Sequence, residues 1–250
     1  MYEAQAQEPK RRRDAGILQV TERDTIALTW IAEQFCISFD QLRYLLGRYA
    51  KAATKTPNVL STSATRDAVE RWLLMGFIEE PRKIISGHSP YIWLSRRGLS
   101  QLELPYAYYK PQISSIKHIY AVNAIRLHLE SQSSQLYWYP ERMLTKETSL
   151  RPLPDAELHT PGTQNHIAIK IIETSFKHNI TLIEAIQTLK ELAQRYPSLW
   201  YFVEAQAMTV IQQALTSLEK DTQERITLHR LDSQASTQIQ KHLLPNKDTG

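Results

Sequence analysis

The stretch STSATRDAVERWLLMGFIEEPRKIISGHSPYIWLSRRG (61–98) decides the expected fold of the first half of the chain. Ser61 or Thr62 is a typical N-cap, and apolar residues then recur at helical spacing until Gly76, where a helix end is expected. Beyond it, two apolar-alternating runs flank SGHSP (86–90), a combination that is typical of a β-hairpin. The stretch therefore predicts a helix that leads directly into a hairpin.

Two further helices are expected upstream of this stretch. Thr21 and Asp24 form a capping-box pattern, with the acid three residues after the hydroxyl, and apolar positions then recur at helical spacing. A second short helix fits residues 38–46, with Ser38 as its N-cap and Gly47 where a helix stop is expected. Three helices followed by a hairpin are the order of elements in a winged helix-turn-helix, in which the hairpin is the wing.

That order of elements carries a functional expectation. In helix-turn-helix modules the last helix enters the major groove of DNA, and residues early in that helix contact base edges. Cations on a wing are then placed to contact the flanking phosphates. The expected DNA-binding residues of the helix are Thr62, Ser63, Thr65, Arg66 and Arg71, and those of the wing and the segment after it are Arg82, Lys83, His88, Arg96 and Arg97.

The distribution of charge also indicates that DNA would bind to the first half of the chain. Residues 1–110 hold sixteen Lys and Arg against twelve Asp and Glu, a net charge of +4, whereas residues 111–250 hold fourteen of each and are neutral. A polyanion would therefore be attracted to the first half. We interpret residues 1–19 as a flexible basic arm, which contacts phosphates or serves as a solubilising tail. The arginines of this arm are Arg11, Arg12 and Arg13.

Composition disfavours several classes of protein. The single cysteine, Cys36, leaves no disulfide framework or Cys-rich zinc module, and its apolar surroundings predict a buried thiol. No run of about eighteen apolar residues could cross a membrane. The first residues lack the apolar core of a secretory signal, so a cytoplasmic location is expected. The eight histidines show no metal-ligand spacing and no glycine-rich phosphate loop is present, so we expect no metal site and no cofactor.

The second half predicts an α/β domain. A Pro- and Tyr-rich segment, residues 106–115, is the expected linker between a DNA-binding domain at 20–105 and a second domain at 116–232. The second domain opens with a helix of mixed character and continues with three runs rich in β-branched and aromatic residues, at 136–144, 149–158 and 166–175. The last run alternates Ile167, Ile169 and Ile171 on one face with Ala168, Lys170 and Ile172 on the other, which would place Glu173 on the face of Ile167. A helix, a strand, a helix and a last edge strand follow. We therefore expect an α+β chain whose second part is an α/β sandwich on a mixed sheet, with a flexible tail at 233–250.

The same order of elements is the core of restriction-endonuclease-like proteins. In such a core an acid precedes one strand and an acid-x-Lys triplet lies in the next, so that carboxylates hold a divalent ion and the lysine supports the attacking water. Asp155 is placed for the first acid, but the next strand offers Lys170 and Ile172 at the triplet positions. A lysine repels the ion and isoleucine transfers no proton, so we expect a degenerate nuclease fold and no enzyme. The residues of a nuclease here would be Asp155, Glu157, Glu173 and Lys177.

Six pieces of the chain, spread over roughly residues 20–215, match a family pattern. They are ERDTIALTWIAEQFCISFDQL (22–42), ATRDAVERWLLMGFIE (64–79), LSRRG (94–98), KHIYAVNAIRLHL (117–129), LRPLPDAEL (150–158) and HIAIKIIETS (166–175). With these pieces the chain resembles the replication-relaxation family, plasmid and mobile-element proteins linked to plasmid replication and DNA relaxation. The resemblance implies a winged-helix DNA-binding domain joined to a nuclease-like domain. The family has an acid where this chain has Lys170, so the resemblance does not extend to cleavage.

The combined expectation is an accessory DNA-binding protein of a plasmid, conjugative element or transposon. It would bind double-stranded DNA and recruit a replication, relaxase or transposition protein, alone or as a homodimer, and would not bind a membrane. Binding should weaken steeply with salt because phosphate contacts dominate affinity. Three alternatives stay open: a transcriptional repressor that uses the same helix and wing, a Mg²⁺-dependent nuclease, and a protein adaptor with a winged fold.

Overall fold

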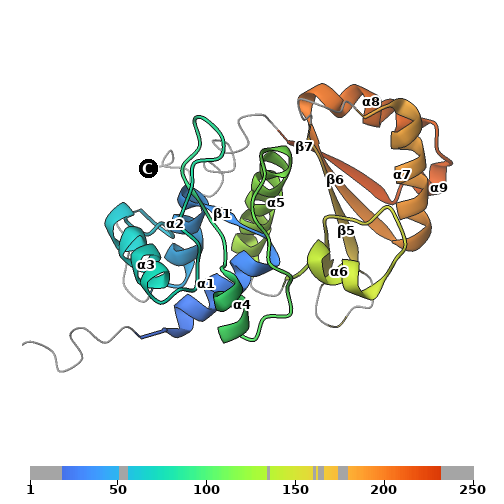
Figure 1. The fold of residues 1–250 in the computed structure, drawn as a ribbon. Helices are drawn as coiled ribbons and strands as arrows, with labels where there is room; N and C mark the ends of the chain where they lie inside the picture. The colour runs from blue at the N-terminus through green and yellow to red at the C-terminus, as the bar shows by residue number, and fades with distance from the viewer. Residues whose placement is uncertain are drawn as a thin grey trace, which may run out of the picture.

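The computed structural model has an N-terminal helical part with a small hairpin, followed by a mixed five-stranded sheet with helices (Figure 1). It describes residues 19–50, 56–133, 136–159, 162, 166–173 and 180–231. Apart from Gln19, the predicted arm and its arginines Arg11, Arg12 and Arg13 lie outside the described residues, as does the predicted tail. Of the helices in the described ranges, none is long and apolar enough to span a membrane.

The first three helices start at the N-caps that the sequence predicts. Thr21 accepts a hydrogen bond from the Asp24 backbone, and the Asp24 carboxylate accepts one from the Thr21 backbone. Ser38 begins the second helix with the same reciprocal arrangement, and Ser61 caps the third. These caps satisfy N–H groups that a helix start leaves without partners. The helices are α1 (Glu22–Glu33), α2 (Phe39–Arg48) and α3 (Thr62–Leu74).

A hairpin follows α3, as predicted. We call residues 78–94 the hairpin, since Ile78 pairs with Leu94 in an antiparallel bridge at its base. Its returning arm contains a short strand that pairs with another strand between α1 and α2, so the hairpin is tied to the helices. The short elements in this part are β1 (Ile37–Ser38), β2 (Tyr91–Ile92) and α4 (Arg96–Gln101).

The two glycines that were predicted to end helices have different roles. Gly76 follows the last turn of α3 with a φ of +74°, the backbone conformation in which glycine commonly ends a helix. Gly47 does not end α2, which continues to Arg48, so that prediction is wrong. A Cβ at Gly47 would overlap the backbone carbonyl of Asn58. The glycine at position 47 therefore permits a close approach of two backbone segments.

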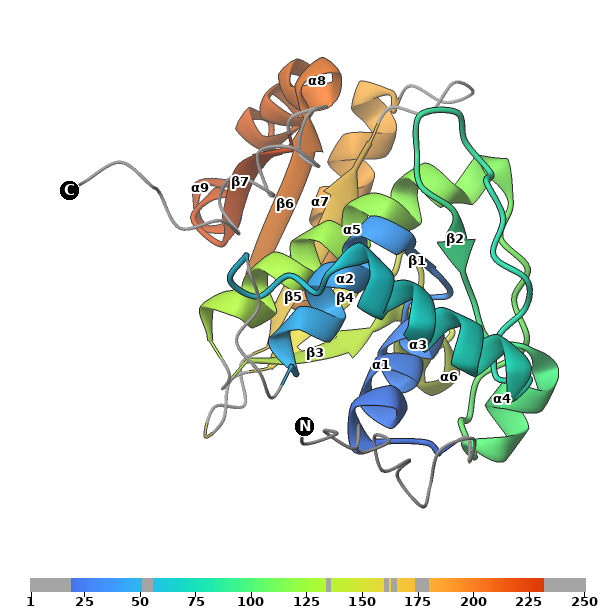
Figure 2. The same cartoon turned by 90° about the vertical axis from the view of Figure 1, so that its left-hand side faces the viewer.

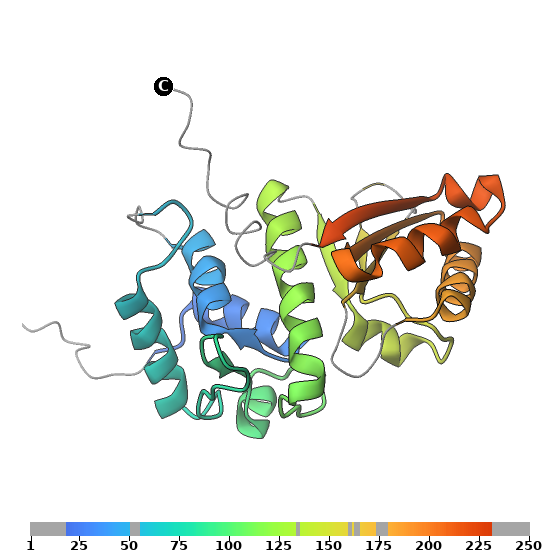
Figure 3. The ribbon, with the colours of Figure 1, turned by 90° about the horizontal axis from the view of Figure 1, so that it is seen from above.

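Helix α5 (Ile113–Gln132) lies between the N-terminal part and the sheet, as Figures 1 and 3 show. Leu127 packs in the core of the N-terminal helices, whereas Val122, Ile125 and Leu129 pack in a second core against the sheet. Helix α5 contacts both the N-terminal helices and the sheet, which explains why its sequence does not show a single apolar face. Two tyrosines of the segment predicted as a linker, Tyr106 and Tyr108, also pack against the N-terminal core.

A polar network joins α5 to the first two helices. Arg126 pairs with Glu33 at 2.6 Å and with Glu130 at 2.7 Å. Glu130 also accepts hydrogen bonds from Arg48 at 2.9 Å and from the indole nitrogen of Trp30 at 3.2 Å. Burial alone would raise the pKa of Glu130, but the charge and hydrogen bond of Arg126 and the charge of Arg48 outweigh it and lower that pKa. The network therefore holds charged groups at this contact in matched pairs.

The sheet is mixed, as predicted. Its strands, in order across the sheet, are β3 (Tyr137–Pro140), β4 (Ala156–His159), β5 (Ile167–Ile172), β6 (Ser198–Glu204) and β7 (Ile226–Leu231). The pairs among β3, β4 and β5 are antiparallel, and those among β5, β6 and β7 are parallel. The predicted edge strand is confirmed in β7. The run at 136–144 was expected to be extended throughout, but it turns into a helix at Glu141.

Helices cover both faces of this sheet (Figures 1 and 3). Ile169 and Ile171 of β5 pack in the core shared with α5, and Ala168 packs in the core shared with α7 and α8. This alternation of side chains along β5 is the one that the sequence predicts. The remaining helices are α6 (Glu141–Glu147), α7 (Leu182–Arg195), α8 (Ala205–Thr216) and α9 (Lys220–Gln223).

Candidate functional site

A groove lies between the start of α3 and the hairpin. Figure 2 shows α3 turned toward the viewer, with the strand β2 of the hairpin beside it. The volume of the groove is about 590 Å³. Thr62 and Arg66 of α3 line it together with Lys83 and His88 of the hairpin, and Asp40 at the start of α2 lines it as well. The structure thus brings four of the predicted DNA-binding residues to one groove from two separate elements.

The basic residues around this groove are directed to solvent. Arg66 on α3 and Lys83 on the hairpin are both exposed, and so are Ser63 and Arg82 beside them. Exposed guanidinium and ammonium groups are able to contact phosphates without a large desolvation cost. The groove therefore presents hydroxyl groups and positive charges on one accessible surface.

Two predicted DNA-binding residues do not have the expected character. Thr65 is fully buried, and its hydroxyl donates to the carbonyl of Ser61 at 2.9 Å, so it does not face a groove and that prediction is wrong. His88 does line the groove, with its Nδ1 2.8 Å from the hydroxyl of Tyr91. Burial lowers the pKa of His88, against the opposing charge of Asp40, which disfavours a positively charged ring at this place.

The other predicted arginines lie away from the residues that line the groove. Arg71 forms an ion pair of 2.5 Å with buried Asp24. Arg96 lies over the ring of Tyr108, with its guanidinium carbon 4.5 Å from the ring centroid. Arg97 is exposed on α4 next to Gly76. The structure therefore gives Arg71 and Arg96 partners within the protein.

Arg71→Ala is expected to lower the free energy of unfolding by about 1.5–3 kcal/mol, the usual cost of losing a hydrogen bond to a charged group. Asp24 is 1% exposed and keeps its bond from the Trp72 indole at 2.9 Å, which limits the loss. Urea unfolding measures this change in the free energy of unfolding. Glu70→Ala, an exposed change one residue earlier on α3, is the matched control and should stay within about 0.5 kcal/mol of the parent. Equal losses of stability in Arg71→Ala and Glu70→Ala would contradict the assignment of Arg71 to an ion pair with Asp24.

Asp155, the predicted first acid of a nuclease site, is buried and paired. Its carboxylate accepts hydrogen bonds from Lys170 at 2.8 Å and from the Ile171 backbone at 2.6 Å, and it lies 3.3 Å from the Nε2 of His118. Burial alone would raise the pKa of Asp155, but the charges of Lys170 and His118 outweigh it and hold that pKa well below its usual range. Burial would lower the pKa of His118, and the charge of Asp155 outweighs this and raises it.

The remaining residues of the predicted nuclease set have other partners. Glu173 forms an ion pair of 3.2 Å with Lys117 of α5, and so lies on the face of the sheet that carries Ile169 and Ile171, as predicted. Glu157 accepts a hydrogen bond of 2.7 Å from Tyr196 at the end of α7. Lys177 lies outside the described residues. Among the residues that are described, the three acids do not gather into a single group of potential metal ligands.

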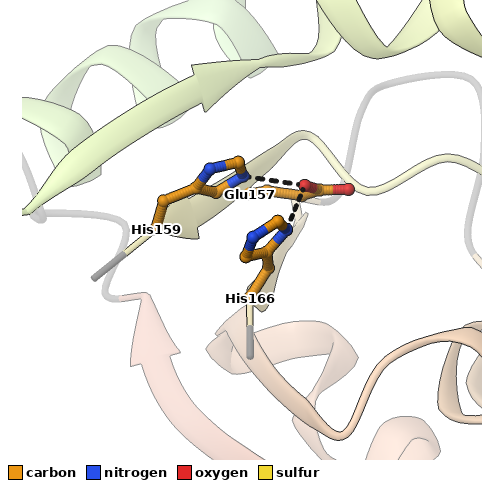
Figure 4. Close-up of side chains that lie close together, drawn as sticks. All are labelled: Glu157, His159 and His166. Atoms are coloured by element: carbon orange, nitrogen blue, oxygen red, sulfur yellow. Dashed lines mark hydrogen bonds and ion pairs between the residues drawn. The ribbon is translucent and has the colours of Figure 1, made fainter. Parts of the chain in front are cut away.

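Glu157 belongs instead to a cluster that the sequence did not reveal. Its Oε2 lies 2.9 Å from the Nε2 of His159 and 3.2 Å from the Nδ1 of His166 (Figure 4). No metal site was expected because the histidines show no ligand spacing along the chain. In the structure the three side chains come from β4 and from the residue that directly precedes β5. A Glu-x-His pair on one strand with a histidine opening the next strand was the available signal.

Comparison with models of known protein families found no match, and searches for similar curated proteins and similar solved structures found none either. Function is therefore inferred from the fold and from the surfaces described above. The resemblance to the replication-relaxation family stays a prediction.

Proposed function

We propose that this protein binds double-stranded DNA with the start of α3 and the hairpin. The observation that carries the proposal is the shared groove, which Thr62 and Arg66 line from α3 and Lys83 lines from the hairpin. An arginine and hydroxyl groups at the start of a helix are suited to contact base edges. A lysine on the neighbouring hairpin is suited to contact a flanking phosphate.

The order of elements supports a winged helix-turn-helix as the class of this N-terminal part. In that assignment α3, which packs on α2, is the recognition helix. The hairpin is the wing, and β1 joins it to the helices through β2. Arg66 in the second turn of α3 is exposed, whereas Arg71 in its last turn pairs with Asp24 and the exposed acids Asp67 and Glu70 follow Arg66. We therefore expect the first turns of α3 to approach the DNA most closely.

In the second half, the pairing of Asp155 favours a binding role over cleavage. The Lys170 ammonium lies 2.8 Å from the Asp155 carboxylate, at the strand position where a nuclease of this plan needs an acid. Together with the resemblance to the replication-relaxation family, this favours an accessory protein of a plasmid, conjugative element or transposon. Its second half would then contact a replication, relaxase or transposition protein.

The experiment that tests DNA binding is a fluorescence-anisotropy titration of a random-sequence duplex at several NaCl concentrations. Phosphate contacts by Arg82 and Lys83 would each contribute about −0.9 to the slope of log K against log salt, about −1.8 in total. The affinity should then fall roughly 12-fold for a fourfold rise in salt. Absence of binding at low salt, or an affinity that salt does not change, would contradict the proposal.

A further inference from the structure

Glu157, His159 and His166 come together because of strand geometry. Glu157 and His159 are two residues apart on β4, so their side chains leave the same face of the sheet. β4 and β5 are antiparallel, with Leu158 opposite Ile167, and the same register places His166 opposite His159. Three side chains with metal-binding atoms therefore share one face of two neighbouring strands.

We propose that Glu157, His159 and His166 bind a divalent transition-metal ion, with Zn²⁺ as the expected occupant. Two imidazole nitrogens and one carboxylate oxygen are a set of ligands that zinc accepts in proteins, with a water molecule as the fourth ligand. Mg²⁺ and Ca²⁺ prefer ligand sets made of oxygen atoms, so they suit this cluster less well. The inference goes beyond the proposed DNA binding and does not depend on it.

The spacing of the ligand atoms suits such an ion. All three lie within 4.8 Å of one another, and the Glu157 oxygen is 2.9 Å from His159 and 3.2 Å from His166. A tetrahedral zinc ion with bonds of about 2.0–2.1 Å separates its ligand atoms by about 3.3 Å. The imidazole rings are stacked with centroids 3.6 Å apart. Side-chain rotations that tilt these rings apart would direct their nitrogens at an ion without moving the strands.

The surroundings of Glu157 favour a cation at this place. Its side chain is 12% exposed, and a carboxylate with so little exposure needs a compensating positive charge. Within the described ranges, its polar partners are two imidazoles and the Tyr196 hydroxyl, and none of its ion pairs is with a lysine or arginine. A bound metal would supply for Glu157 the charge that Lys170 supplies for Asp155.

Tyr196 is a positioning residue for this cluster. Its hydroxyl donates to the Oε1 of Glu157 at 2.7 Å. The Oε2 of Glu157 is the atom in contact with both histidines (Figure 4). Partners that orient a metal ligand in this way typically change metal affinity about 10–100-fold. His159 and His166 are 27% and 39% exposed, so an ion is able to reach the cluster from solvent.

The test is a titration of the metal-free full-length chain with Co²⁺, which replaces zinc and reports its coordination in the visible spectrum, followed by displacement with Zn²⁺. We expect one Co²⁺ to bind per chain with the intense absorption of four-coordinate cobalt. This absorption should disappear when Zn²⁺ displaces the cobalt. His159→Asn and His166→Asn should abolish the signal, and Tyr196→Phe should weaken the affinity about 10-fold or more. His128→Asn, a histidine change on α5, should behave as the parent.

The titration of the parent chain decides the proposal even if a variant folds poorly. If the parent binds neither Co²⁺ nor Zn²⁺ in a saturable way, the site does not exist. Unchanged binding by the His159→Asn and His166→Asn variants would overturn the assignment of the ligands. Zn²⁺ should also raise the melting temperature of the parent but not of those two variants. Because the cluster is separate from the α3 groove, loss of metal binding with duplex binding intact would leave the proposed function standing.

Discussion

Asp155→Ala is expected to destabilise the protein by about 3–5 kcal/mol, because removing one partner of a buried ion pair leaves the other charge uncompensated. Asp155 is 3% exposed and Lys170 is 20% exposed, so water replaces little of the lost interaction. The backbone N–H of Ile171 also loses its acceptor at 2.6 Å. Urea unfolding followed by tryptophan fluorescence measures the change.

Two further variants make this prediction specific. Asp155→Leu combined with Lys170→Met should recover most of the lost stability, because replacing both partners of a buried pair with apolar residues is often close to neutral. Asp221→Ala removes an exposed acid on α9 and should change stability by less than about 0.5 kcal/mol. A loss at Asp155 no larger than the loss at Asp221 would show that the buried pair does not form.

The pH dependence of this effect has a definite sign. The pKa of Asp155 is lowered in the folded protein, so its contribution is present above its unfolded pKa of about 3.9 and is lost as the pH falls. The pKa of His118 is raised, so its contribution is complete below its unfolded pKa of about 6.5 and is lost as the pH rises through the folded value. The stability difference between the parent and Asp155→Ala should therefore be largest between these two limits. A difference that is constant from pH 3 to pH 9 would contradict the pairing.

Removing two charges at the groove is expected to have the largest effect on DNA binding. Arg66→Ala should weaken duplex binding by about 1–3 kcal/mol, roughly 5- to 150-fold, if Arg66 contacts a base edge. Lys83→Ala should weaken binding to all sequences alike and reduce the steepness of the salt dependence by about 1. Both residues line the groove and are exposed, so neither change should disturb the core.

The matched control removes the same charge from the second half of the chain. Lys190 on α7 and Lys220 on α9 are exposed, so Lys190→Ala with Lys220→Ala changes the net charge as much as the groove variants do. We expect this control to lower the affinity only slightly, through the long-range field of the protein. An equal loss of affinity in this control and in a chain that carries both Arg66→Ala and Lys83→Ala would show that net charge, and not the groove, attracts the DNA.

The features that the sequence predicted are those set by neighbours along the chain. The caps at Thr21, Ser38 and Ser61 depend on a side chain reaching a backbone group three residues away, and all three are present. The alternation of β5 depends on the two-residue period of a strand and is confirmed too. The pairing of Glu173 on the α5 side follows from the same period.

The features that the sequence missed depend on residues far apart in the chain. Gly47 was taken for a helix stop because its contact with Asn58 is made by folding and leaves no local pattern. Thr65 was expected in a groove, but the packing of α3 buries it. Arg71 was expected on DNA, but it pairs with Asp24, forty-seven positions earlier. The cluster around Glu157 needed the register of β4 and β5, which no spacing along one segment reveals.

The most direct test of DNA binding by α3 and the hairpin is a photo-crosslinking map. Thr62 and Ser86 both line the groove. Thr62→Cys and Ser86→Cys variants, each labelled with a benzophenone, are irradiated with a duplex, and a labelled Lys190→Cys variant is the control. Native Cys36 should stay unlabelled, because it is fully buried and burial raises the pKa of its thiol. We predict DNA adducts from positions 62 and 86 and only background from position 190. Adducts from position 190 that equal or exceed those from positions 62 and 86 would contradict DNA binding by α3 and the hairpin.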